Sequence, residues 1–130
     1  MKTAVRYYSR SGNTKVLAEA IARAAGTEAI SVDQAGSELE EPVDVLFIGG
    51  ALYAYGLDKH LKEYLKGIKN GCAKKAVVFS TSLISKHSID LIKKGLAGKG
   101  IEVEEDSFYA RSKPDAEKLK EAERFVGKFI

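Results

Sequence analysis

Short apolar runs alternate with longer amphipathic segments along the chain. The apolar runs are rich in residues that favour strands, and they lie at residues 4–8, 28–32, 43–50, 74–80 and 100–110. The third run, VDVLFIGG, is nearly continuous, which is typical of a strand that is covered on both faces. We therefore predict five strands.

Apolar residues at helical spacing predict four helices between and after these runs. The first begins at Asn13 and stops at Gly26, because glycine is a natural residue at a helix end. The other three carry their apolar positions within 57–68, 86–97 and 119–129. Ser112 and Asp115 have the spacing of a capping box that would open the last helix. The polar connector at 33–42 is too short, and too interrupted by glycine, to predict a helix.

Strands that alternate with helices form βαβ units, which build a parallel sheet with helices on both faces. The length of 130 residues fits a single domain. We predict an α/β fold over 1–130, with one doubly wound, five-stranded parallel sheet. Ligands of such sheets bind beyond the carboxyl ends of the strands. The loops to consider therefore follow strands one, three and four, and read SRSGNT, GGALYAYG and STSLISKH.

Composition and the length of the apolar runs indicate the cellular compartment in which the protein works. Cys72 is the single cysteine, which excludes an internal disulfide and a cysteine-based zinc site, and we interpret it as a structural thiol. No apolar run approaches the roughly 20 residues of a membrane span, and no signal peptide is visible. We therefore predict a cytoplasmic protein without a membrane span.

The net charge of +3 is spread thinly over the chain. One helical face does carry a row of basic residues, which is made up of Lys59, Lys62, Lys66 and Lys69. Such rows are usually solvated helix faces, so we predict that nucleic acid is not a partner.

The first loop has the chemistry of an anion site. Ser9, Ser11 and Thr14 supply hydroxyl groups, and Gly12 permits a sharp turn into the first helix. The backbone N–H groups of residues 10–14 would then point out of a helix N-terminus, where the helix dipole also favours negative charge. Ordinary capping of a helix needs only one such side chain. The loop has neither the Lys-Ser/Thr ending of a Walker A motif nor the Gly-x-Gly-x-x-Gly of a dinucleotide fold.

The stretch from Tyr8 to Thr14, YSRSGNT, resembles the phosphate loop of flavodoxins, and IGGALYAYG and FSTS fall at the matching ends of strands three and four. The resemblance covers the whole chain in element order. It implies a flavodoxin-like sheet of order 2-1-3-4-5, with FMN lying across the switch point between strands one and three.

The same resemblance implies which residues contact FMN. The phosphate would be wrapped by residues of the first loop: Ser9, Arg10, Ser11, Gly12, Asn13 and Thr14. The second and third flavin loops would contribute Ala51, Leu52, Tyr53, Ala54, Thr81, Ser82 and Leu83. A tyrosine gains free energy by stacking on the flat flavin ring. We expect Tyr53 to be that residue, with Tyr55 as the second candidate.

Several features distinguish this chain from many flavodoxins. The third loop has no aromatic residue for a second stacking ring, so Leu83 or Ile84 would cover one flavin face, or that face would be open. The net charge is positive, whereas carrier flavodoxins are usually acidic. Arg6 lies within a strand predicted to be central, where a buried arginine needs a partner.

Two functions follow from the resemblance. The first is a low-potential electron carrier whose partners are a flavoprotein reductase and an acceptor protein, with the lysine row favouring an acidic partner. The alternative is a small FMN-dependent oxidoreductase that acts on a quinone or porphyrinogen-like substrate over the open flavin face. His60 and His87 are the acid/base candidates for such an enzyme, but histidines near helix starts are more often plain surface residues. We assign no catalytic residue.

Overall fold

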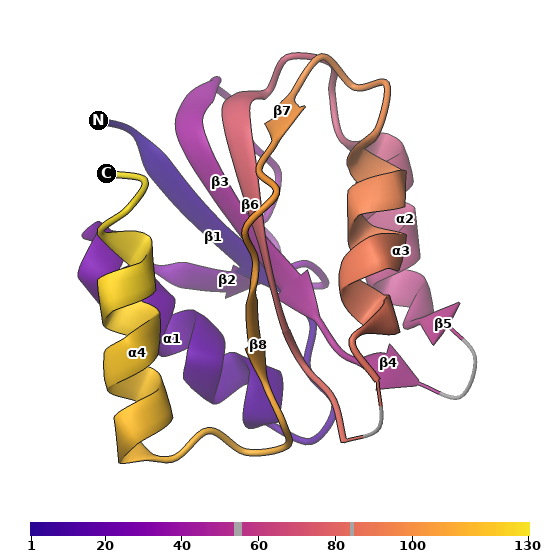
Figure 1. Cartoon of the computed structure of the whole chain (residues 1–130). Coiled ribbons are helices and arrows are strands. Elements are labelled where there is room, and N and C mark those ends of the chain that lie inside the picture. The colour runs from indigo at the N-terminus through magenta and orange to yellow at the C-terminus, as the bar shows by residue number, and fades with distance from the viewer. Residues whose placement is uncertain (54–55, 84) are drawn as a thin grey trace.

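A parallel sheet forms the middle layer of the computed structural model, which describes residues 1–53, 56–83 and 85–130 (Figure 1). Its strands are β1 (Thr3–Tyr7), β2 (Ala29–Ser31), β3 (Val43–Gly50), β6 (Ala73–Thr81), β7 (Glu102–Val103) and β8 (Phe108–Ala110). They lie in the order β2-β1-β3-β6-β7, and β8 also pairs with β6. Since β7 and β8 share the fifth position, the predicted order 2-1-3-4-5 and the fold class are confirmed. A short antiparallel hairpin of β4 (Leu52–Tyr53) and β5 (Gly56–Leu57) lies outside this sheet.

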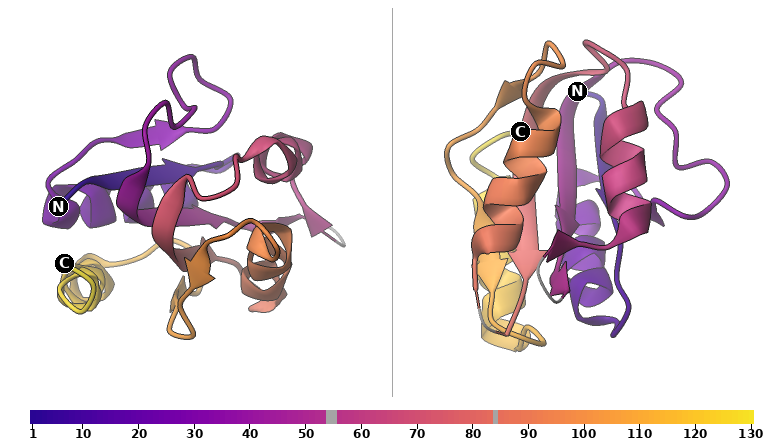
Figure 2. Two further views of the ribbon diagram at one scale, coloured as in Figure 1. Left: turned by 90° about the horizontal axis from the view of Figure 1, so that it is seen from above. Right: turned by 90° about the vertical axis from the view of Figure 1, so that its right-hand side faces the viewer.

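Four helices cover the two faces of the sheet. They are α1 (Asn13–Ala25), α2 (Lys59–Gly67), α3 (His87–Leu96) and α4 (Ala116–Val126). Figure 2 shows the sheet passing between the α1–α4 pair and the α2–α3 pair. None of the helices in the described part of the chain combines the length and apolar character needed to cross a membrane.

Side chains that alternate along β3 fill a separate core on each face. Leu46 and Ile48 pack toward α2 and α3, whereas Val45 and Phe47 pack toward α1 and α4. Leu46, Phe47 and Ile48 are fully buried, and burial of one such side chain contributes about 1.5–3 kcal/mol. This burial on both faces explains why the sequence of β3 is nearly continuous in apolar residues.

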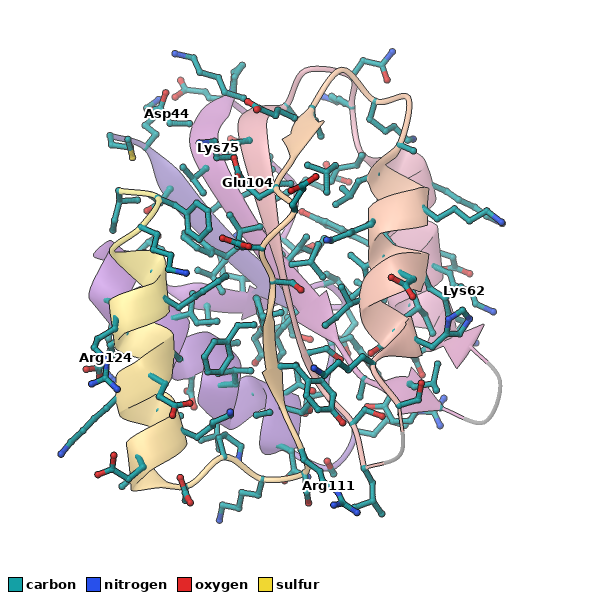
Figure 3. All side chains as sticks on the ribbon, in the orientation of Figure 1. Asp44, Lys62, Lys75, Glu104, Arg111 and Arg124 are labelled. Atoms are coloured by element: carbon teal, nitrogen blue, oxygen red, sulfur yellow. The ribbon has the colours of Figure 1, made fainter. Side chains whose placement is uncertain are left out.

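The predicted strand at 100–110 is interrupted, which corrects the sequence-based expectation. β7 pairs with β6 at Lys75 and Ala76, and β8 pairs with it from Phe79 to Thr81. The intervening residues 104–107 carry three acidic side chains. Glu104 forms an ion pair with Lys75 of β6 at 3.1 Å (Figure 3). Charges on an edge strand discourage pairing with another chain.

Arg6 finds a backbone partner in the connector that replaces a helix after β2. The side chain is buried, and its Nε donates a hydrogen bond to the Ser37 carbonyl oxygen at 2.6 Å. The Tyr64 hydroxyl of α2 donates to the same oxygen. The guanidinium group therefore holds the connector against the sheet.

The predicted capping box of the last helix is wrong. Asp115 is the N-cap of α4, and its carboxylate accepts a hydrogen bond from the Lys118 N–H at 2.9 Å. Ser112 instead has a positive φ of 63°. The reason is Pro114, because a residue that precedes proline is disfavoured in the helical region, so the helix cannot include Lys113.

We predict that Gly49→Ala destabilises the fold strongly. A Cβ atom at Gly49 would lie 2.3 Å from the Phe79 ring and 2.4 Å from the Phe79 carbonyl oxygen, and overpacking of this kind costs about 1–3 kcal/mol. Urea unfolding would measure the loss. Gly67→Ala is the matched control, because a Cβ there meets nothing within 4 Å, and alanine should stabilise that helical position by up to ~1 kcal/mol. Equal effects of the two substitutions would contradict this account.

Candidate functional site

The three loops singled out in the sequence come together at the carboxyl edge of the sheet. Strands β1, β3 and β6 are paired side by side, with Tyr7 opposite Gly49 and Gly49 opposite Phe79. The Thr14 and Thr81 hydroxyls share a buried hydrogen bond of 2.6 Å, which joins the first and third loops. The Arg10 N–H donates to the Tyr53 hydroxyl at 3.0 Å, which joins the first and second.

The first loop presents a helix N-terminus whose N-cap residue is Gly12, which has no side chain that could cap it. Gly12 has a φ of +94°, a conformation that glycine adopts easily, and α1 begins at the next residue. The Ser9 and Ser11 hydroxyl oxygens accept hydrogen bonds from the N–H groups of Gly12 and Asn13 at 3.0 and 3.4 Å. The first turn contains no acidic residue. The positive end of the helix dipole is therefore available to an external anion.

The second loop leaves β3 through Ala51 and continues into the β4–β5 hairpin, where Leu52 and Tyr53 form β4. The half-buried Tyr53 ring lies under the Arg10 guanidinium group, with Cζ 4.0 Å from the ring centroid. Burial raises the pKa of Tyr53, so its hydroxyl stays protonated at neutral pH. Ala54 and Tyr55, two further candidates from the sequence, lie outside the described residues.

The third loop begins with two buried polar residues and continues with an exposed apolar one. Thr81 ends β6, and the carbonyl oxygen of Ser82 accepts a hydrogen bond from the Tyr109 hydroxyl. Leu83 is 63% exposed, and Met1 and Ile130 are the other large exposed hydrophobic residues in the described part of the chain. An apolar side chain thus faces solvent at this edge. Ile84 lies outside the described residues.

A buried carboxylate that the sequence analysis missed organises the charges beside these loops. Asp58 is only 5% exposed, and it accepts hydrogen bonds from Nε and Nη2 of Arg10 at 2.9 and 2.6 Å. It also caps α2 through the His60 N–H and pairs with the His60 ring Nδ1, both at 2.8 Å. The signal in the sequence was an aspartate immediately before a helix, which is a preferred N-cap.

Competing effects act on the pKa of Asp58. Burial alone would raise it, but the hydrogen bonds from the His60 N–H, the Arg10 side chain and the His60 ring hold it below its ordinary value. Asp58 is therefore ionised at neutral pH. Arg10 was expected to contact a phosphate. In this structure its guanidinium group is hydrogen-bonded to Asp58 and lies over the Tyr53 ring.

The two histidines differ in their surroundings. The His60 ring is stacked on Tyr8, with 4.8 Å between the ring centroids and an interplanar angle of 13°. His87 is exposed, and its Nδ1 lies 3.9 Å from an exposed Asp90 carboxylate. His60 therefore belongs to the candidate site, whereas His87 is a surface residue at the start of α3.

Comparison with known proteins identifies the family. The family model for the flavodoxin domain matches residues 4–130. The chain belongs to the flavodoxin family. Flavodoxins bind flavin, generally FMN, and transfer electrons to redox partners. A search of curated proteins finds no match for the chain.

Solved structures agree with this flavodoxin fold. A flavodoxin from the domain Archaea is 24% identical, with a TM-score of 0.77 over 99% of this chain and 96% of that one. Flavodoxin 2 from Bacillus cereus is 20% identical, with a TM-score of 0.82 over 99% and 97%. Rubredoxin oxygen:oxidoreductase from Desulfovibrio gigas is 13% identical, with a TM-score of 0.81 over 98% of this chain but 35% of that larger chain. At these identities the likeness establishes the fold.

We predict that Asp58→Asn removes a part of the pH dependence of stability. Asparagine can still cap α2, but it offers no charge to Arg10 or His60. Because the folded pKa of Asp58 is lowered, its stabilising effect is full above its unfolded pKa of about 4 and is lost as the pH falls through the folded value. The variant should therefore have a lower Tm than the parent at pH 7, and the gap should narrow as the pH falls below about 4.

Thermal unfolding followed by circular dichroism between pH 3 and 7 would measure this gap. Asp90→Asn is the matched control, since it removes the same charge from an exposed position on α3. A gap that is as large for Asp90→Asn, or that does not change with pH, would show that the Asp58 charge is not stabilising.

Proposed function

We propose that this protein binds FMN and acts as a low-potential electron carrier between redox proteins. The observation that carries the proposal is the junction of the three loops, where the Thr14–Thr81 and Arg10–Tyr53 hydrogen bonds lie beside the N-terminus of α1. A free, buried thiol at Cys72 fits a reducing compartment, and we propose that the protein works in the cytoplasm.

The residues of the first loop fit a phosphate group. The N–H groups at the start of α1, the positive-φ turn at Gly12 and the hydroxyls of Ser9 and Ser11 supply hydrogen-bond donors without a competing carboxylate. The Thr14 hydroxyl is paired with that of Thr81, and either oxygen can be the donor of this bond. We propose that Thr14 joins the first and third loops and, where Thr81 is the donor of this bond, still offers its own hydrogen to the phosphate beside the backbone and the serines.

The second and third loops would hold the ring system. Tyr53 is the proposed stacking residue, and the Arg10 guanidinium group already covers one face of its ring. Leu83 would contribute an apolar side chain that is otherwise exposed to water. When it is bound, FMN itself supplies the electron chemistry, and the protein supplies binding, orientation and electrostatic tuning.

One observation favours the alternative, an oxidoreductase that acts on a quinone or porphyrinogen-like substrate. His60 lies against Tyr8 and is hydrogen-bonded to an ionised Asp58, which is an arrangement that can hold a proton donor in place. The third loop also offers Leu83 where a second aromatic residue would cover the flavin. We favour the carrier, because the same Asp58 is already committed to capping α2 and pairing with Arg10.

We predict that the chain binds FMN far more tightly than riboflavin. Hydrogen bonds to a charged group contribute ~1.5–3 kcal/mol each, so losing two or more phosphate contacts should weaken binding by at least ~100-fold. Titration of the apoprotein, followed by quenching of flavin fluorescence, measures both affinities. Equal affinities for the two flavins would remove the phosphate site from this proposal.

We predict that the protein loaded with FMN is reduced slowly by NADPH alone and much faster when a flavoprotein reductase is added. Stopped-flow absorbance of the flavin follows both reactions. A carrier depends on contact with the reductase, and contact between exposed charges should weaken as salt is raised. Saturable steady-state turnover with NADPH and a small quinone, without any protein partner, would instead support the oxidoreductase.

A further inference from the structure

A groove lies between α2 and α3, next to the candidate site but outside it. Its volume is about 460 Å³. The walls consist of leucines, glycines and lysines from the hairpin, the two helices and the segment after α3. Figure 2 shows the two helices side by side, with their outer surfaces toward the viewer in the right-hand view.

The floor of the groove is apolar because of close packing between the helices. Leu57 and Leu65 are buried, and Leu91 is half-buried. A Cβ atom at Gly95 would lie 2.9 Å from the Leu65 side chain, so glycine is what allows α3 to approach Leu65 this closely.

The rim of the groove is basic. Lys62 and Lys66 of α2 and Lys94 of α3 are exposed, and none of them forms an ion pair within the described residues. Lys99 is already engaged, because its Nζ donates to the carbonyl oxygens of Lys66 and Ile68 at the end of α2. Among the residues that the structure describes, no acidic one lines the groove. The surface therefore attracts negative charge and offers apolar area beneath it.

We propose that this groove binds an acidic amphipathic helix of a partner protein, with its apolar side chains on the leucine floor and its carboxylates on the lysine rim. Helices α2 and α3 have 9 and 10 residues, which corresponds to a length of about 14–15 Å. The residues of these helices that line the groove lie within Lys62 to Lys66 and Leu91 to Gly95, about one turn of each helix, so the groove engages at least one turn of a bound helix. Lys62 and Lys66 are four residues apart, so their spacing matches that of carboxylates at i and i+4.

The groove begins at the hairpin that carries Tyr53. Gly56 and Leu57 form β5, which pairs with β4, and the Lys62 ammonium group lies over Gly56, 3.4 Å from where its Cβ would be. Figure 3 shows Lys62 beside this hairpin. A helix bound here would place its protein next to the second candidate loop. This inference specifies the partner in the proposed electron-carrier function, although peptide binding itself needs no flavin.

The test uses a fluorescein-labelled 14-residue synthetic peptide with leucines at helical spacing and glutamates elsewhere. Fluorescence anisotropy measures its affinity for the purified protein and for the variant Lys62→Glu, Lys66→Glu, Lys94→Glu. The matched control is Arg23→Glu, Lys113→Glu, Lys120→Glu, which makes the same charge change at exposed positions away from the groove. We expect the groove variant to lose at least tenfold in affinity and the control less than threefold. Replacing the leucines of the peptide by serine should also cost at least tenfold.

Several outcomes would overturn the proposal. Equal losses for the two variants, or no effect of the serine peptide, would show only general charge attraction. Binding of dodecanoate, with no binding of the peptide, would assign the groove to a small amphiphile. A dimer in sedimentation velocity that the groove variant abolishes would assign it to a second copy of the chain. FMN binding by the groove variant is measured in a separate titration. A failure to bind FMN would reject the proposed function, but it would not change the conclusion drawn from the peptide affinities.

Discussion

The parallel pairing of β1, β3 and β6 is the constraint on which the candidate site depends. Because these strands run in the same direction, with Gly49 opposite both Tyr7 and Phe79, their following loops leave the sheet at one edge. Gly49 permits this register, since any side chain there would collide with Phe79. The buried hydrogen bond between Thr14 and Thr81 then ties the start of α1 to the end of β6. A slip in register would separate the first and third loops and leave two buried hydroxyls without partners.

Much of the fold could be predicted because both faces of the sheet are buried, which makes the apolar runs strong and local. The runs predicted at 43–50 and 74–80 agree with β3 and β6 to within one residue at either end. The break between β7 and β8 was missed because Glu102 and Glu104 alternate with apolar residues at the start of the run, as they would on the exposed face of an edge strand. The ion pair of Glu104 depends on Lys75 of a neighbouring strand. The start of α4 was missed for a local reason, the restriction that Pro114 places on the residue before it.

The candidate site, like the fold, could be predicted from the sequence only in part. The hydroxyl-rich first loop is contiguous in sequence, so its chemistry was visible before the fold was known. Asp58 is 48 residues from Arg10, and the stacking of His60 on Tyr8 likewise joins distant segments. The role of Thr14 was ambiguous for a chemical reason. A hydroxyl group both donates and accepts hydrogen bonds, so it fits an anion in one context and another hydroxyl in the next, and the contact of Thr14 with Thr81, 67 residues away, is not visible in the sequence.

The distribution of charge explains how one small surface can attract two different anionic ligands. Asp58 neutralises Arg10, so the proposed phosphate site draws its positive potential from backbone N–H groups and the α1 dipole, which are fixed in direction and act within one turn. The α2–α3 groove draws its potential from lysine side chains, which are mobile and act over about a Debye length. Backbone N–H donors that are fixed in direction select a small ligand whose acceptor atoms match their geometry. Mobile ammonium groups tolerate differences in a protein surface and steer it during encounter. The β4–β5 hairpin carries Tyr53 at one end and borders the groove at the other, so it places the two kinds of recognition next to each other without letting them compete for the same anion.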